Sequence, residues 1–218
     1  MDWSIIPKFF STFGQAAWMT IIVTVFGILI GVVIGLLFSL MRISKFKIIS
    51  FPARLYIWLI RGTPLLLQLF FIYYGMTKII MLDSLPSAFI ALGLHNGAYI
   101  AEIFRGAIQS VDRGQKEAGK ALGMTKAKIM KRIILPQALK RAIPPLSNQF
   151  IIALKDSSLA STIAVPELLN KTRQLGSSSF KMMEFLIIAA IYYLMLTSVL
   201  TIIANFIEKR MRVSDHRT

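Results

Sequence analysis

The chain contains no cysteine, which excludes a disulfide framework and a thiolate metal site. Histidine is nearly as scarce, with only His95 and His216. Two histidines are too few to predict a catalytic cluster of histidines and carboxylates. Charged residues make up 16% of the chain, whereas 56% of its residues are hydrophobic and its mean hydropathy is +0.66. Average soluble domains are less apolar, so this composition indicates an integral membrane protein.

The apolar residues stand in long blocks with few charges, each about the 20 residues that a helix needs to cross a hydrocarbon core of about 30 Å. The first block is too long for a signal peptide, and Asp2 stands where such a peptide carries basic residues. We predict an all-α membrane protein with one transmembrane domain over residues 1–218. Its five transmembrane helices are expected at about 17–41, 54–75, 84–105, 142–163 and 185–207.

The basic residues predict the orientation of these helices. Of 25 lysines and arginines, four lie in the loop after the first span, ten in the loop after the third and four in the C-terminal tail, which includes Arg217. Cytoplasmic loops carry such an excess, so we expect the N-terminus outside and the C-terminus in the cytoplasm. No nucleic-acid-binding motif accompanies the net charge of +15, which argues against a nucleic-acid partner.

A basic, helix-prone loop of residues 106–141 separates the third and fourth spans. A first helix over residues 105–122 is expected to end at Gly123, because glycine is the favoured residue just after a helix. Thr125 can cap a second, short helix that stops before Pro136. We call this predicted cytoplasmic helix–turn–helix the bracket, and a protruding element of this kind suits docking into the groove of a partner.

Part of the bracket resembles the sequence pattern of a phosphate-binding loop. Gly114 to Lys120 fits the pattern, but Ala121 stands where a serine or threonine must hold magnesium. No strand precedes the segment, and no length remains for a nucleotide-binding domain. We therefore expect this chain to bind no ATP, metal or other cofactor.

Polar side chains line up along three of the predicted spans. The stripes are Arg54, Arg61 and Gln68 in the second span, His95, Tyr99 and Glu102 in the third, and Asn148 and Lys155 beside Gln149 and Asp156 in the fourth. Ionisable groups within a membrane cost roughly 2.5–3.5 kcal/mol each and face the protein interior or a water-filled path. Two interpretations of Arg61 and Glu102 stay open: a pair that joins two helices, or contacts to a ligand.

Glycines recur every four residues in the first span, at Gly27, Gly31 and Gly35. Such a row lets another backbone approach closely. Packing within the same bundle is favoured over a contact between subunits, because small-residue faces are common in membrane helices.

Several motifs together point to a known family. The bracket contains Glu117-Ala118, then Gly123, Ile133 and Leu135-Pro136, an arrangement that resembles the EAA signature of permease subunits of bacterial ABC importers. Residues 61–64 (RGTP), 99–106 (YIAEIFRG) and 154–159 (LKDSSL) resemble the polar amino acid branch of that family. Gly119 replaces the second alanine of the signature, a small-for-small change expected to lower helix propensity only.

The resemblance implies a multi-pass subunit of the bacterial cell membrane, in an importer of two membrane subunits, two ATPase subunits and an extracytoplasmic amino-acid-binding protein. The second membrane subunit would be another copy or a close relative, and the ATPase would use the ATP and Mg. The bracket would dock on the ATPase. The implied coupling residues are Glu117, Ala118, Gly119, Gly123, Ile133, Leu135 and Pro136.

On this resemblance, the polar stripes become candidates for substrate binding, because an amino acid needs a cationic or amide partner for its carboxylate and an anionic or carbonyl partner for its ammonium group. The candidates are Asn96, Tyr99, Glu102, Gln68, Arg61, Lys155, Asp156, Ser157 and Ser158. Two carboxylates, Glu102 and Asp156, favour a cationic substrate. The alternative is a membrane-embedded scaffold or enzyme subunit without transport activity, which would not explain polar stripes on three spans.

Overall fold

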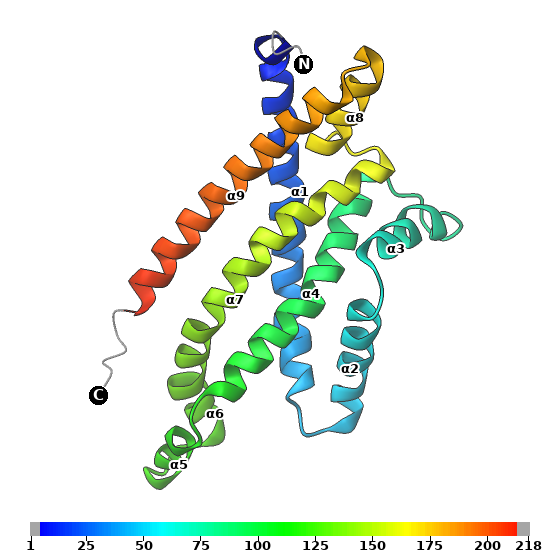
Figure 1. The fold of residues 1–218 in the computed structure, drawn as a ribbon. Coiled ribbons are helices and arrows are strands. Elements are labelled where there is room, and N and C mark those ends of the chain that lie inside the picture. Colours follow the sequence, from blue (N-terminus) through cyan, green and yellow to red (C-terminus); the bar gives the residue numbers. More distant parts are fainter. Residues whose placement is uncertain (1–4, 213–218) are drawn as a thin grey trace.

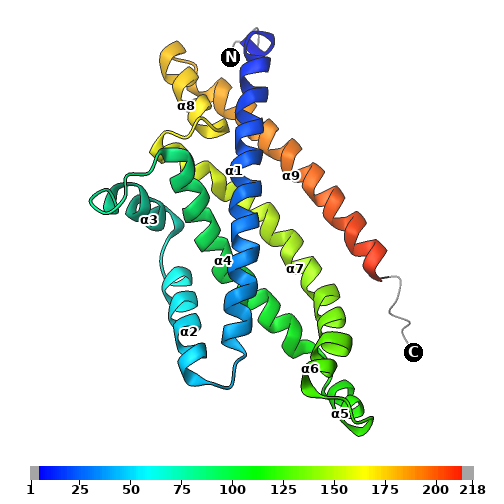
Figure 2. The same ribbon diagram turned by 180° about the vertical axis from the view of Figure 1, so that it is seen from behind.

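The computed structural model describes residues 5–212, so Asp2, His216 and Arg217 lie outside it. Every regular element within this range is a helix. The helices are α1 (Ile5–Arg42), α2 (Lys47–Arg61), α3 (Leu65–Phe70), α4 (Ser84–Ser110), α5 (Arg113–Ala121), α6 (Lys126–Ile129), α7 (Leu135–Asp156), α8 (Leu168–Ser179) and α9 (Met182–Arg212), with π-helical turns at Phe71–Gly75 and Met130–Ile134 and a 3-10 helix at Ser157–Ile163. Figures 1 and 2 show α1, α4 and α7 along the length of the molecule, with α5 and α6 at one end and α8 at the other.

Among the described residues, two helical stretches are long and apolar enough to cross a bilayer, Phe9–Arg42 and Met182–Met211. A third crossing results if the bent pair of α2 and α3 counts as one span. These stretches overlap the first, fifth and second predicted spans. The all-helical membrane fold is thereby confirmed, whereas the remaining two spans, on α4 and α7, and the orientation stay predictions.

The second predicted span is not one straight helix. Residues 62–64 (Gly-Thr-Pro) interrupt it, and α3 bends away from α2 by 106°, because a proline cannot donate the next helical hydrogen bond. The Gln68 side chain donates to the Ile60 carbonyl at 2.8 Å and so occupies a carbonyl that the interruption leaves open. The prediction that Arg54, Arg61 and Gln68 share one helix face is therefore wrong, because the helix ends at Arg61.

The glycine row on α1 packs against α4. A Cβ added at Gly31 would lie 2.9 Å from the Asn96 Cβ, and one added at Gly35 would lie 2.6 Å from the Ile100 Cγ2. Real Cβ atoms do not approach other carbons so closely, so only glycine permits this helix separation. The interpretation of the row as packing within the bundle is confirmed.

A fully buried carboxylate, Glu167, ties α8 to α9 at the end opposite the bracket. Its oxygens accept the backbone N–H groups of Leu169 at 2.9 Å and Asn170 at 2.6 Å, which caps the start of α8. The Tyr193 hydroxyl of α9 donates to the same carboxylate at 2.8 Å. Burial raises the pKa of Glu167 above its usual value, although these donors favour the charged form.

Candidate functional site

The turn of the bracket is built by Gly123, whose φ of +70° is the left-handed conformation that glycine adopts at little cost. The Gly123 N–H donates to the Lys120 carbonyl at 2.9 Å, and the Met124 N–H donates to the Gly119 carbonyl at 3.0 Å. This pair of bonds is the Schellman motif that closes a helix. The next helix, α6, is capped at its N-terminus by Thr125, whose hydroxyl accepts the Lys128 N–H at 3.3 Å. The predicted helix end at Gly123 and the predicted N-cap at Thr125 are confirmed.

The first arm of the bracket is shorter than predicted. The third-span helix α4 continues to Ser110, and the Asp112 carboxylate then caps a new helix by accepting the Gly114 N–H at 2.6 Å. The single helix predicted over 105–122 is therefore wrong, because an aspartate at this position starts α5 afresh.

The second arm does not stop before Pro136, so that prediction is also wrong. Helix α6 passes through the π-helical turn Met130–Ile134 directly into α7, without an intervening loop. Pro136 lies in the first turn of α7, where a proline is tolerated, and the wide turn just before it alters the usual hydrogen-bond register.

The two arms contact each other through Gly119, which is buried. A Cβ there would lie 2.9 Å from the Ile129 Cγ1 and 3.1 Å from the Ile133 Cδ1, so an alanine would crowd the packing as well as change helix propensity. Glu117 is exposed, as is Ala118 beside it. Within residues 5–212, Glu117 makes no hydrogen bond or ion pair.

The nine candidate substrate residues fall into three separate groups. Arg61, Tyr99 and Glu102 lie on the bracket side of the bundle; Gln68 and Asn96 are internal; the remaining four, residues 155–158, lie where α7 becomes the 3-10 helix. Glu102 and Asp156 stand on opposite sides of the contact between Asn96 and Gln149, separated along the helix axes by roughly 20 Å at about 1.5 Å per residue. One chain does not gather these residues into a single site.

The internal group is occupied by contacts within the chain. Asn96 is 0% exposed; its amide nitrogen donates to the Leu92 carbonyl and its oxygen accepts from Gln149, both at 2.8 Å. The Gln68 oxygen lies 3.2 Å from the His95 ring nitrogen. These side chains join α3, α4 and α7. The pairing of Asn96 with Gln149, 53 residues away on another helix, could not be predicted from residue spacing.

The first group lines a cavity of about 450 Å³, which we call the arginine cavity. Its lining residues are Arg42, Arg54, Ile57, Trp58, Arg61, Gly62, Tyr99 and Glu102. The Glu102 carboxylate is held by Arg105, with a closest contact of 2.6 Å, and lies 3.7 Å from Arg42. Arg61 instead lies over the Tyr99 ring, 5.1 Å from its centroid, so no direct Arg61–Glu102 pair forms here.

The third group continues an exposed polar stripe along α7. Asn148 and Lys155 are exposed, and Asp156 is half-buried. Neither charged residue has a hydrogen-bond or ion-pair partner in the part of the chain described. Ser157, by contrast, is buried and donates to the Leu154 carbonyl at 2.7 Å. The stripe leaves charged groups uncovered on a helix of the bundle, which is expected where a second subunit or a water-filled path lies against it.

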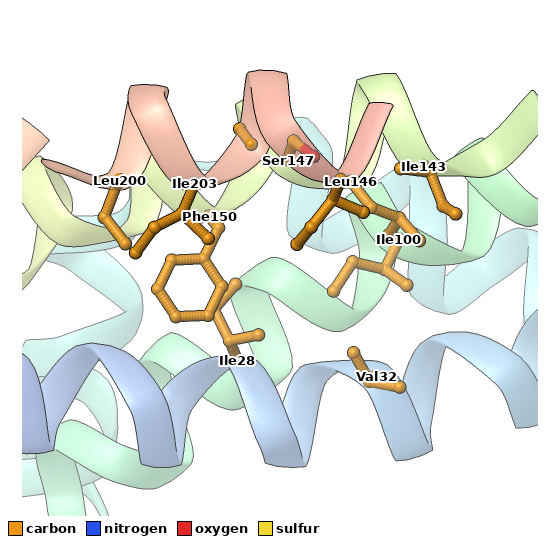
Figure 3. A pocket seen from close by; sticks show the side chains of 11 residues that line it. Ile28, Val32, Ile100, Ile143, Leu146, Ser147, Phe150, Leu200 and Ile203 are labelled. Atoms are coloured by element: carbon orange, nitrogen blue, oxygen red, sulfur yellow. The ribbon is translucent and has the colours of Figure 1, made fainter. Parts of the chain in front are cut away.

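A further cavity of about 380 Å³ lies between α9 and the α1, α4 and α7 helices. Figure 3 shows Phe150 and Leu200 among the apolar side chains that line it, with the Ser147 hydroxyl as the oxygen in view. A wall of this composition offers almost no hydrogen bonds to a polar ligand, so this cavity does not suit an amino acid.

Residues 27–213 match the family model described as a binding-protein-dependent transport system inner membrane component. The glutamine transport system permease protein GlnP of Escherichia coli (strain K12) is 38% identical over 97% of this chain and 98% of its own length. The L-cystine transport system permease protein TcyB of Bacillus subtilis (strain 168) is 40% identical over 97% of this chain and 92% of its own.

Among solved structures, a chain from an amino acid ABC transporter crystallised with histidines is 37% identical, with a TM-score of 0.93 over 96% of this chain and 99% of that one. The family match over residues 27–213 includes the bracket, the arginine cavity and the α7 stripe. The chain belongs to the family of binding-protein-dependent transport system inner membrane components.

Proposed function

We propose that this chain is the permease subunit of an ATP-driven importer of amino acids, in which a separate subunit hydrolyses ATP. Similarity along nearly the whole chain to permeases named for glutamine, cystine and arginine transport carries the proposal. The polar stripe on α7 adds support, because an amino acid crossing a bilayer needs polar groups at membrane depth.

The translocation path is proposed to run along α7, between this chain and a second membrane subunit that is either another copy or a relative. Lys155 would meet the substrate carboxylate, and Asp156 its ammonium group or a cationic side chain. Neither group forms a salt bridge or a hydrogen bond within residues 5–212, and a charged group without such a partner is costly in a membrane. A neighbouring subunit would enclose Lys155 and Asp156 together with water and substrate, and these would solvate the two charges.

The bracket is proposed to dock on the ATPase, on the cytoplasmic side of five spans. Glu117 is exposed without a partner in the described chain, and Leu122, just before the turn, is 80% exposed. An exposed leucine at the end of a helix suits docking into a hydrophobic groove of a partner. Helices α6 and α7 connect this surface to Asp156 without a loop, so movement at the bracket would reach the stripe.

Purification of the tagged chain in mild detergent, followed by mass spectrometry, tests the assembly. We expect an ATPase with a complete phosphate-binding loop to co-purify, and the accompanying membrane chain distinguishes homodimer from heterodimer. Reconstituted with its binding protein, the complex should take up amino acids only with ATP. Absence of any ATPase across several detergents would contradict the proposal and favour the scaffold alternative.

A further inference from the structure

The arginine cavity carries more positive charge than its own carboxylate can balance. Arg42, Arg54 and Arg61 line it, against Glu102 as its acidic residue. Glu102 is already engaged by Arg105, which lies outside the lining and holds both carboxylate oxygens, with Nε at 3.0 Å from each. An anion bound in the cavity would therefore accept hydrogen bonds from guanidinium N–H groups that lack enough acceptors within the described chain.

The hydrogen bonds of these arginines confirm that shortage. The Arg42 Nε is buried and has no hydrogen-bond partner within residues 5–212, since its distance of 3.7 Å to Glu102 is too long for one. Arg54 is exposed and forms no ion pair within residues 5–212. Arg61 contacts the face of Tyr99, a contact that leaves its N–H donors free. Guanidinium groups with free donors match phosphate oxygens well.

An apolar cavity of about 500 Å³ lies on another face of α2. It lies at the bend between α2 and α3, and its lining includes Leu59, Ile60 and Leu67. Residues 58, 61 and 62 line the arginine cavity, whereas residues 59, 60 and 63 line the apolar one, so the two occupy different faces of α2. At the end of this helix, the consecutive residues Gly62 and Thr63 line the arginine cavity and the apolar cavity, respectively. A charged compartment beside an apolar one matches a ligand with an anionic head and a hydrocarbon tail.

The surrounding surface of α2 is suited to lipid. Trp58 is 70% exposed and Phe51 is 65% exposed, and tryptophan is enriched where the headgroups meet the hydrocarbon. In the proposed orientation, Arg42 at the end of α1 lies on the cytoplasmic side, where anionic lipids attract basic residues. A soluble amino acid would leave the apolar cavity empty, and a neighbouring protein would have to bring its own anion.

We infer that the arginine cavity and the apolar cavity beside it form a binding site for one anionic phospholipid of the inner leaflet. The phosphate lies among Arg42, Arg54 and Arg61, and an acyl chain lies against the bend between α2 and α3. The site is distinct from the α7 stripe proposed for substrate, and it does not depend on which amino acid is carried.

Native mass spectrometry of the full chain, purified with its co-purifying subunits, tests this site. Phosphatidylglycerol and phosphatidylcholine with identical acyl chains are added at equal concentration. We expect tighter retention of phosphatidylglycerol, and a loss of about fivefold in its affinity for Arg54→Gln and again for Arg61→Gln, since each basic residue near an anionic lipid contributes on that order. Arg54 makes no ion pair in the described chain, so its variant is expected to fold normally.

The matched control is Arg173→Gln, which removes the same single charge from an exposed position on α8, at the end opposite the bracket. It should retain phosphatidylglycerol like the unmodified chain. Equal retention of the two lipids, or an equal loss in the control, would overturn the site. Displacement of the lipid by soluble glycerol phosphate at millimolar concentration would also overturn it, because the site would then recognise a free phosphate without a tail.

Discussion

Replacement of Gly31 by alanine tests whether the α1–α4 contact sets the spacing of the whole bundle. The added Cβ would lie 2.9 Å from the Asn96 Cβ, 3.2 Å from the Gly97 nitrogen and 3.4 Å from the Asn96 carbonyl carbon. Two of these atoms are backbone, which no rotamer change can move. Asn96 is also held by Leu92 and Gln149, so relief requires α1 to separate from α4.

The magnitude follows from two opposing effects. Overpacking of this kind costs about 1–3 kcal/mol, whereas alanine gains about 1 kcal/mol of helix propensity over glycine. Gly14→Ala isolates the second effect, because Gly14 lies in the same helix and a Cβ there meets nothing within 4 Å. The difference between the two variants is therefore about 1–3 kcal/mol, or about 2–12 °C in melting temperature for a chain of this size.

Thermal unfolding of both variants in one detergent, at one scan rate, measures this difference. We expect Gly31→Ala to melt below Gly14→Ala, with Gly14→Ala at or above the unmodified chain. Equal melting temperatures for the two variants would refute the packing argument, since the helix would then tolerate a side chain where the structure leaves no room.

Three further predictions concern other regions. Glu167→Gln should remove a pH dependence. Because the folded pKa of Glu167 is raised, its contribution to stability is present at low pH and is lost as pH rises through that pKa. The melting advantage of the unmodified chain over the variant should therefore shrink as the pH is raised above the usual range of a glutamate. A constant difference would contradict this. Gly123→Ala should weaken co-purification of the ATPase, because a side chain at positive φ costs about 1–2 kcal/mol; Gly106→Ala, with open space around it, should not. Asp156→Asn should lower ATP-dependent uptake of arginine more than of glutamine in proteoliposomes, and equal losses would exclude Asp156 as a partner of a cationic side chain.

Local signals predicted much of the fold, because they depend on few residues. A block of apolar residues is sufficient to place α1 and α9, and a glycine followed by threonine two residues later is sufficient to place the turn of the bracket. The glycine row was assigned correctly to internal packing. The break in the second span had its signal in residues 62–64, but a bend of 106° depends on how Gln68 reaches the carbonyl of Ile60, which no periodicity encodes.

The candidate site was less predictable. The spacing of side chains along the sequence shows which residues share a helix face, but it does not show which other helix packs against that face. Asn96 and Asp156 carried equally polar signals, yet one is internal and bonded to Gln149 whereas the other is half-buried without an ion pair in the described chain. Glu167 was missed, since its partner Tyr193 lies 26 residues away on another helix. Pro136 suggested a helix end, but the π-helical turn before it lets the helix continue.

Helix α9 is anchored near one end only. Its buried residues are Phe185, Ile188 and Ala189, close to the Glu167–Tyr193 contact. Figures 1 and 2 show the rest of the helix diverging from α1. From Ala189 to Arg212 the helix extends about 35 Å, so a tilt of only about 5° at the anchor displaces the far end by about 3 Å. Small adjustments among α1, α8 and α9 are therefore amplified along the length of α9, and a single spectroscopic label near Arg212, on a cysteine introduced into a chain that has none, would register them.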